Sequence, residues 1–399
     1  MKTQTSSAII SSLSATLLFL VATVSSAQTQ PPAKPAGTEL IPEPAIAAIL
    51  AAFDKYEVVA LPEAHGLKDL DDFIFSLIRN PSFPDKVNDI AVECGNSLYQ
   101  PVLDRYIAGE DVPFTEVRKV WRNTTQRMCG ESEFFEQFFP LVRAINQKFP
   151  AGKRLRVLAG DPPINWDKVK GPDDMERFLD RDGNIAAVMK REVLSKHRKA
   201  LMLFGTFHLM HRTKIGPEPG DNAVSNYEKD YPNVTFVIDG LSFSGSDLLA
   251  GATSTFISWP VPSLARVKDT WLGALDFSQF SPTPIMIDEN CKVHTEVPKE
   301  LQRPMADLVD AFLYLGPQDL ALWEKLPADI GLDTDYRTEL QRRDSFSGFP
   351  GAPGSLQEAD RWIVSSAEHP IFSMPKMPDP KDLEKSCLEM KESGSTPPK

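Results

Sequence analysis

The sequence predicts an α/β fold: a mostly parallel β-sheet with helices on both faces, plus a helical and irregular C-terminal extension. The main observation is that short apolar runs alternate with amphipathic stretches of helical period from about residue 40 to residue 240. Such alternation is typical of parallel strands joined by crossover helices. The composition, 42% hydrophobic and 25% charged over 399 residues, is ordinary for a globular chain that buries a sizeable core.

Two patterns give the order of the elements. Short, mainly apolar runs predict strands at 57–61, 89–93, 155–159, 200–204 and 234–238. Apolar residues at helical spacing predict helices, most clearly at 69–79. The same spacing predicts further helices at 46–53, 98–107, 131–149, 184–194 and 305–315. The Gly- and Pro-rich stretch 346–355 predicts a loop.

The first 27 residues have the pattern of a secretory signal peptide. Lys2 is followed by the apolar stretch 8–24, and Ser25-Ser26-Ala27 places small residues at a cleavage site. The alternative is an uncleaved membrane anchor, but the Ser and Thr residues within the stretch weaken it as a span. We therefore expect an exported protein, periplasmic or secreted, that is not an integral membrane protein once the signal peptide has been removed.

Composition divides the rest of the chain into four parts. The Pro/Ala/Thr-rich residues 28–39 predict a flexible leader, and residues 376–399 predict a flexible tail. Between them we expect an α/β core domain at 40–250, which carries the site, and a C-terminal extension at 251–375 packed on this core.

The charge balance bears on the partners. Asp and Glu number 55 against 43 Lys and Arg, which gives a formal net charge of −12. Such a surface repels phosphate backbones and no basic cluster offsets it, so we expect no nucleic-acid partner.

Four cysteines occur in the chain, and an exported protein can form disulfides from them. Four cysteines allow three pairings, and the sequence leaves the pairing of Cys291 and Cys387 open. Cys94 follows the last residue of a predicted strand, so alternation points it away from the face that Glu93 occupies. We expect Cys94 to be structural or bonded to Cys129, and not a nucleophile.

Ionisable residues follow each predicted strand, and the carboxyl ends of parallel strands meet at one edge of a sheet. The first strand is followed by Glu63 and His65, and the second ends in Glu93. The later strands are followed by Asp161, by His208 and His211, and by Asp239. Three of the six histidines in the chain thus lie at two strand ends.

Two kinds of chemistry fit this set. His65, Glu93 and His208 form a two-histidine, one-carboxylate group that can hold a divalent transition metal and activate a bound water. Glu63 would then act as a general base or orient an imidazole. Without a metal, a histidine flanked by carboxylates can itself activate water or a substrate hydroxyl.

Arg181, Asp161 and His211 are the candidate substrate-binding residues. Arg181 opens the helix before the fourth strand and can reach the sheet edge to bind an anionic group or an oxyanion. The structural alternatives are that Arg181 only pairs locally, that Asp161 caps a turn, and that His211 starts a helix at the surface. Asp182 or Asn184 is the expected N-cap.

These motifs, taken in order over roughly residues 55 to 240, resemble one superfamily. It groups the erythromycin esterase-like proteins, the ChaN-like haem-binding proteins and the TraB/Tiki proteins. The matching pieces are Pro62-Glu63-Ala64-His65-Gly66, Glu93, Arg181-Asp182-Gly183-Asn184-Ile185-Ala186 and Gly205-Thr206-Phe207-His208. The sequence departs from the pattern at Pro62, where glycine is usual, and nothing from about Thr255 onward matches.

The resemblance implies three activities. Tiki-like members are metal-dependent proteases, which carries onto His65, Glu93 and His208. Erythromycin esterase-like members hydrolyse a lactone with a histidine base, which carries onto His65 and Glu63. ChaN-like members bind haem, which makes His65, His208 or His211 the axial ligand.

We expect an exported hydrolase that acts on an ester, lactone or peptide bond of a small-molecule or peptide substrate through a His/Glu centre. One alternative is a haem- or small-ligand-binding protein without catalysis. The other is an enzymatically silent envelope protein whose C-terminal part binds a partner.

Overall fold

The structure is a computed structural model, and it describes only part of the chain. The described residues are 37–211, 221–240, 256–279, 286–287, 290–294, 299–317, 320–322, 324, 327, 329–330, 332–347 and 380–392. The predicted signal peptide, most of the predicted leader and most of the predicted loop 346–355 lie outside them. Across the described residues, no helix is both long and apolar enough to cross a membrane.

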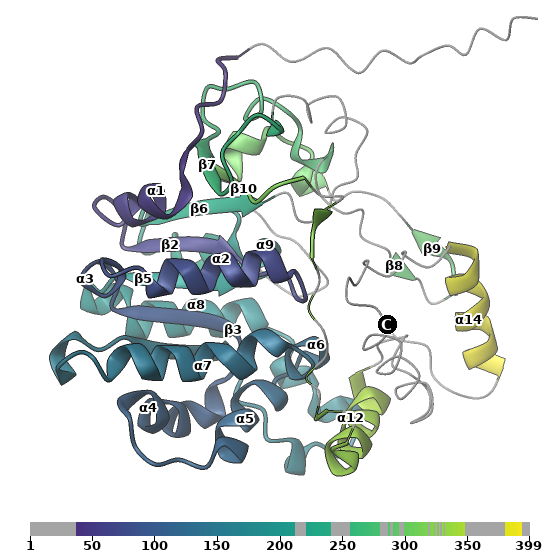
Figure 1. The fold of residues 1–399 in the computed structure, drawn as a ribbon. Coiled ribbons are helices and arrows are strands. Elements are labelled where there is room, and N and C mark those ends of the chain that lie inside the picture. The colour runs from purple at the N-terminus through teal and green to yellow at the C-terminus, as the bar shows by residue number, and fades with distance from the viewer. Residues whose placement is uncertain are drawn as a thin grey trace, which may run out of the picture.

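A mostly parallel sheet of eight strands confirms the predicted fold class (Figure 1). Its order is β1-β7-β10-β6-β2-β5-β3-β4, and the six strands from β10 to β4 run parallel to one another. β7 pairs antiparallel with β10 and β1, and a separate pair, β8 and β9, is also antiparallel. The strands are β1 Glu43–Pro44, β2 Val58–Pro62, β3 Asp89–Asn96, β4 Arg156–Asp161, β5 Ala200–Phe204, β6 Thr235–Gly240, β7 Ser263–Arg266, β8 Met286–Ile287, β9 Val293–His294 and β10 Ala311–Tyr314.

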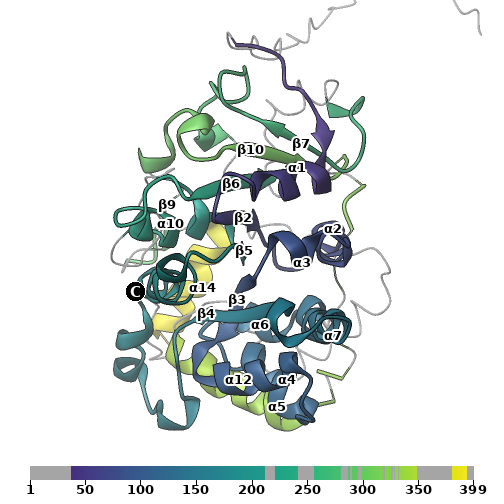
Figure 2. The same cartoon turned by 90° about the vertical axis from the view of Figure 1, so that its left-hand side faces the viewer.

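Helices cover both faces of the sheet (Figure 2). As a result, the central strands β2, β3 and β5 are buried along their whole length. Val59 and Leu61 pack on one face among α1, α2, α4, α5 and α7. Val58 and Ala60 pack on the other, among α8 and α10. The helices are α1 Ala45–Ala52, α2 Lys68–Arg79, α3 Phe83–Lys86, α4 Gln100–Ala108, α5 Phe114–Arg122, α6 Arg127–Gly130, α7 Glu133–Asn146, α8 Arg181–Glu192, α9 Thr206–Leu209, α10 Ala223–Tyr227, α12 Thr334–Ser347 and α14 Pro380–Glu392.

The helix predicted at 305–315 is wrong. Met305–Asp307 forms a single 3-10 turn after Pro304, and Ala311–Tyr314 is the buried strand β10 between β6 and β7. A short apolar run reads alike as a buried helix or a buried strand, and periodicity does not separate the two. The strand pairing on both sides decides the outcome, because it satisfies the backbone groups of a fully buried segment.

One part of the predicted flexible tail, residues 380–392, is more ordered than predicted. Pro380–Glu392 forms α14, and a disulfide joins its Cys387 to Cys291 next to β9. The Glu384 carboxylate accepts a hydrogen bond from the Val293 backbone. A cross-link that closes a separation of 96 residues restricts this helix, which its polar composition alone does not predict.

The chain after β10 returns across the sheet edge toward α12 (Figure 1). Leu320, Ala321, Leu322 and Glu324, which we call the strap, belong to this stretch, and Leu322 and Glu324 pair with the backbone at the start of α2. The Lys68 N–H donates to the Leu322 carbonyl at 2.9 Å, and the Glu324 N–H donates to the Gly66 carbonyl at 2.7 Å. The predicted C-terminal extension therefore contributes the strands β7 and β10 to the sheet. It also contributes the strap, which lies beside the strand ends.

Candidate functional site

The ends of five adjacent parallel strands carry the ionisable side chains that the sequence predicted there. In sheet order, β6 brings Asp239, β2 is followed by Glu63 and His65, β5 by His208, β3 carries Glu93 and β4 ends in Asp161. Their side chains are buried or half-buried at the carboxyl edge.

His65 and Glu63 form a dyad in the loop between β2 and α2. His65 Nδ1 lies 2.8 Å from Glu63 Oε2, and the Glu63 side chain is buried while that of His65 is 19% exposed. The Glu63 N–H donates to the Phe204 carbonyl and extends the β2–β5 pairing past Pro62. Gly66 has φ +86°, a left-handed conformation that glycine adopts without strain. The loop thus turns sharply directly after His65.

Glu93 is the centre of the cluster. Its Oε1 accepts a hydrogen bond from Arg181 Nη2 at 2.9 Å and lies 3.6 Å from His208 Nε2 and 4.0 Å from His65 Nε2. Its Oε2 accepts a hydrogen bond from the Gly205 backbone at 2.6 Å. A Cβ at Gly205 would stand 3.3 Å from that oxygen, so glycine permits the close approach.

Arg181 is a buried cation between two carboxylates. Besides Glu93, its Nε donates to Asp161 Oδ1 at 3.0 Å, and its Nη1 lies 3.4 Å from His208 Nε2. Asp161 also accepts hydrogen bonds from the backbone and the hydroxyl of Thr125. The structure therefore brings Arg181 and Asp161 into the cluster. There they bind each other, and Arg181 also binds Glu93.

Asp182 has a role that the sequence reasoning missed. The N-cap of α8 is neither Asp182 nor Asn184 but Asp180, whose side chain accepts from the Gly183 N–H. Asp182 instead lies 2.8 Å from His208 Nδ1 and accepts from the Ala223 N–H at 2.7 Å. Polar candidates crowd this turn, and only the helix register decides which one caps it.

The charges of the cluster are strongly coupled. Burial lowers the pKa of His65, but the Glu63 carboxylate outweighs it and raises that pKa to about 9. Burial likewise opposes protonation of His208, yet Glu93 and Asp182 raise its pKa to about 10. Although burial disfavours the Glu93 anion, His208 and Arg181 hold its pKa well below the ordinary range. Both histidines are therefore cationic near neutral pH.

Asp239 completes the edge on the β6 side. Burial raises its pKa to about 7, although the Gly240 N–H and the Thr206 hydroxyl stabilise the anion. Thr206 Oγ1 lies 3.3 Å from Asp239 Oδ1, at the start of the short helix that carries His208.

His211 does not join the cluster through any hydrogen bond described for it. Its Nδ1 lies 2.9 Å from Glu228 and its Nε2 lies 3.0 Å from Asp310. Asp310 also accepts from the Val237 N–H of β6. His211 thus links α10, β6 and the start of β10, and a substrate contact by His211 stays a prediction.

The cysteine expected to be structural is confirmed as such. Cys94 and Cys129 form a disulfide across a separation of 35 residues. It fastens α6 to the end of β3, one residue from Glu93, and both cysteines are buried. This bond removes the Cys94 thiolate from any chemistry at the site.

The described residues do not fit a metal ion in the predicted arrangement. The one group of side chains there with ligand atoms within 4.8 Å of one another is Glu63, His65 and Cys94, and the disulfide removes Cys94 as a ligand. In the predicted trio, the Arg181 guanidinium already occupies Glu93 Oε1 and approaches His208 Nε2. A metal ion would have to displace both of these contacts.

Haem ligation meets a related obstacle. Both ring nitrogens of His208 and of His211 contact carboxylates, and an iron would have to displace one of these contacts. Among the three candidate axial ligands, His65 Nε2 is the nitrogen whose described carboxylate contact, 4.0 Å from Glu93, is longest. The haem interpretation therefore depends on His65.

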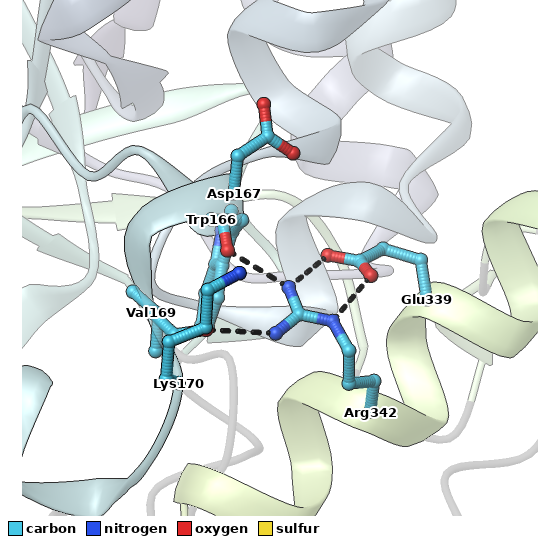
Figure 3. Close-up of a pocket in the computed structure, with 6 residues that line it drawn as sticks. All are labelled: Trp166, Asp167, Val169, Lys170, Glu339 and Arg342. Carbon is cyan, nitrogen blue, oxygen red and sulfur yellow. Dashed lines mark hydrogen bonds and ion pairs between the residues drawn. The ribbon is translucent and has the colours of Figure 1, made fainter.

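A shallow pocket lies elsewhere, between the loop after β4 and α12 (Figure 3). Its volume is about 350 Å³, and none of its lining residues belongs to the cluster. Arg342 in its wall donates to the carbonyls of Trp166 and Val169 and to Glu339. These bonds dock α12 on the loop. The lining residues are Trp166, Asp167, Val169, Lys170, Glu339 and Arg342.

No protein-family model and no curated protein matches the chain. Two solved structures are similar to it in part. A Bacillus cereus protein is 9% identical with a TM-score of 0.43, and the match covers 67% of this chain and 90% of that one. The type III effector HopBA1 is 16% identical with a TM-score of 0.32, covering 52% and 89%. At these TM-scores neither likeness bears on fold or function.

Proposed function

We propose that the protein is an exported hydrolase of the erythromycin esterase/Tiki-like type, acting on an ester, lactone or peptide bond with His65 as its acid–base centre. The observation that carries the proposal is the buried contact between Glu63 and His65, 2.8 Å long, beside the Glu93–Arg181–His208 group. A histidine whose pKa is moved far from its ordinary value by a specific charged partner, as that of His65 is, is typical of catalytic sites.

In the proposed reaction, neutral His65 keeps its proton on Nδ1, which lies 2.8 Å from Glu63 Oε2, and presents Nε2 as a base. Water attacks the carbonyl carbon as its proton passes to Nε2, and the imidazolium then protonates the leaving oxygen or nitrogen. Glu63 fixes the tautomer and stabilises the imidazolium, as the carboxylate does in a serine protease triad. Because the pKa of His65 is about 9, we expect kcat/KM to rise with pH toward an inflection near that value.

His208 is the proposed donor to the oxygen that becomes negative. Its pKa of about 10 keeps it cationic, and Asp182 at 2.8 Å orients the ring so that Nε2 faces the cluster. Arg181 adds positive charge 3.4 Å from the same nitrogen. A fixed, buried donor of this kind stabilises a developing oxyanion without reorganising at the moment of reaction.

The reaction is proposed without a metal, because Arg181 supplies the positive charge that a metal would otherwise provide at Glu93. Metal dependence remains a testable alternative from the sequence. Incubation with EDTA, followed by elemental analysis, separates the two. We expect full hydrolytic activity in protein that holds no stoichiometric transition metal.

The deciding experiment measures hydrolysis of ester, lactone and peptide panels by the purified exported chain. We expect activity on one class, and a loss of about 100-fold or more in His65→Ala, within the usual range for a general base. The matched control is His197→Ala, which removes a histidine that is 84% exposed and also lies near a glutamate. Full activity in correctly folded His65→Ala protein would overturn the proposal.

A further inference from the structure

The strap pairs with the backbone that leads out of the His65 loop. Its Leu322 carbonyl and Glu324 N–H bind the Lys68 N–H and the Gly66 carbonyl, and the Leu322 N–H donates to Asp69 Oδ2 at 2.7 Å. These bonds span the turn at Gly66 and the first turn of α2. A segment from the far C-terminal part of the chain thus fixes the backbone next to His65.

The strap also delivers a carboxyl group to a buried one. Asp71, on the buried face of α2, is only 2% exposed, and no hydrogen-bond donor reaches either of its oxygens. The group that contacts it is the carboxyl of Glu324. Asp71 is buried and Glu324 is half-buried. Two such carboxyl groups in contact are stable when they share a proton, since two adjacent anions in a low dielectric repel strongly.

The surroundings decide which of the two keeps the proton. Burial, together with the neighbouring Glu324 and Glu63, raises the pKa of Asp71 to about 11. Glu324 is the better anion because it accepts from the Phe134 N–H in the first turn of α7 and from Ser132 Oγ at 3.3 Å. A helix N-terminus favours negative charge. Asp71 is therefore the better placed of the two groups to hold a shared proton and donate it to Glu324.

Other charged groups facing the pair agree with this assignment. Glu63 and Glu133 add negative charge, which opposes a second ionisation. Lys68 is the basic group near Asp71, and its ammonium binds the exposed Asp72 at 2.7 Å. When Asp71 is neutral, it adds no negative charge beside Glu63. The Glu63 carboxylate then interacts with His65 without repulsion from Asp71.

We propose that Asp71 and Glu324 are positioning residues for His65: a carboxylic acid and a carboxylate that tie α2, the strap and α7 together and so fix the loop that carries Glu63 and His65. This inference rests on the proposed function and adds that the C-terminal extension completes the site. A cation held by Glu63, Asp71 and Glu324 is the rival, although these three do not come within 4.8 Å as a group among the described residues.

The test compares the full-length chain with Glu324→Ala, Asp71→Asn and Asp71→Leu, using Asp72→Asn on the exposed side of α2 as the control. Asparagine keeps a hydrogen-bond donor for Glu324, so we expect Asp71→Asn to retain kcat within about twofold. Glu324→Ala and Asp71→Leu should lower kcat at least tenfold while KM changes little, because the reacting group is displaced and not the substrate contacts.

A second readout does not depend on activity. Amide hydrogen exchange across residues 63–70 should accelerate at least tenfold in Glu324→Ala and in Asp71→Leu, and it should stay as in the wild type in Asp71→Asn. Wild-type exchange and kcat in folded Glu324→Ala would overturn the positioning role. An Asp71→Asn protein as impaired as Asp71→Leu would show that Asp71 acts as an anion, as the cation site requires.

These outcomes separate this inference from the proposed function. If no substrate is hydrolysed by the wild type, the proposed function fails, and the exchange pattern still decides whether the pair fixes the loop. If hydrolysis depends on His65 but Glu324→Ala changes neither readout, the function stands and the positioning role fails.

Discussion

Replacing Glu63 with Gln should lower the pKa of His65 from about 9 to near or below its ordinary 6.5. The substitution keeps the shape of the side chain and removes the largest influence that raises this pKa. Burial, which favours the neutral imidazole, then acts against the more distant Glu93 alone. The difference between 9 and 6.5 corresponds to about 3 kcal/mol at 1.36 kcal/mol per pH unit.

The raised pKa of His65 also makes the free energy of unfolding depend on pH. A histidine whose pKa is higher in the folded than in the unfolded state stabilises the fold fully below pH 6.5, and this contribution is lost as pH rises through 9. The wild type should therefore lose up to about 3 kcal/mol of unfolding free energy over this range on account of His65. Glu63→Gln should lose much less, although His208 and His211 titrate in both proteins.

Two assays check this prediction. Carbon-13 NMR of labelled histidine follows the His65 titration directly, and reversible urea unfolding between pH 6 and 10 follows the free energy. Glu57→Gln is the matched control, because it removes a carboxylate 3.4 Å from the exposed His197. If wild-type His65 titrates near 6.5, or if Glu63→Gln leaves its pKa near 9, the account of the dyad is wrong.

Three further substitutions test the rest of the site. Arg181→Met should cost about 3–5 kcal/mol in urea unfolding, because it leaves Glu93 and a second buried carboxylate without their cation; a loss below about 1 kcal/mol would contradict this ion-pair role. The Cys94→Ala/Cys129→Ala protein should lose about 2–4 kcal/mol, as the loss of a cross-link over 35 residues predicts, and reductant should destabilise the wild type more than this variant, which keeps only the Cys291–Cys387 bond. His211→Asn should lower the thermal midpoint but leave kcat of the folded enzyme unchanged, since its ring nitrogens bind Glu228 and Asp310. A large fall in kcat at unchanged fold would return His211 to the site.

Sequence patterns were sufficient to predict the central parallel strands of the sheet. Alternating apolar runs predicted five parallel strands within a few residues of their observed bounds. The convergence of Glu63, His65, Glu93, Asp161 and His208 then followed, because parallel strands place their carboxyl ends at one edge. Alternation within a strand likewise turned Cys94 away from Glu93 and toward its partner Cys129.

Local ambiguity limited the sequence reasoning at two places. Ala311–Tyr314 became a strand because β6 and β7 flank it, a fact that its own apolar run does not contain. Asp180 is the N-cap of α8, so the Asp182 carboxylate contacts His208 instead of capping the helix. His211, three residues from His208, turned toward Asp310 instead.

The sequence by itself determined the fold class and the strand-end residues, since both follow from short-range periodicity and from the geometry of parallel sheets. Only the tertiary structure decided how the charges pair: Arg181 between Glu93 and Asp161, and Glu324 against Asp71. The reason is that burial makes an unpaired charge costly, and its partner is set by which side chains the finished fold brings within a few ångströms. Residues as distant in the chain as 71 and 324 leave no local pattern of such a contact.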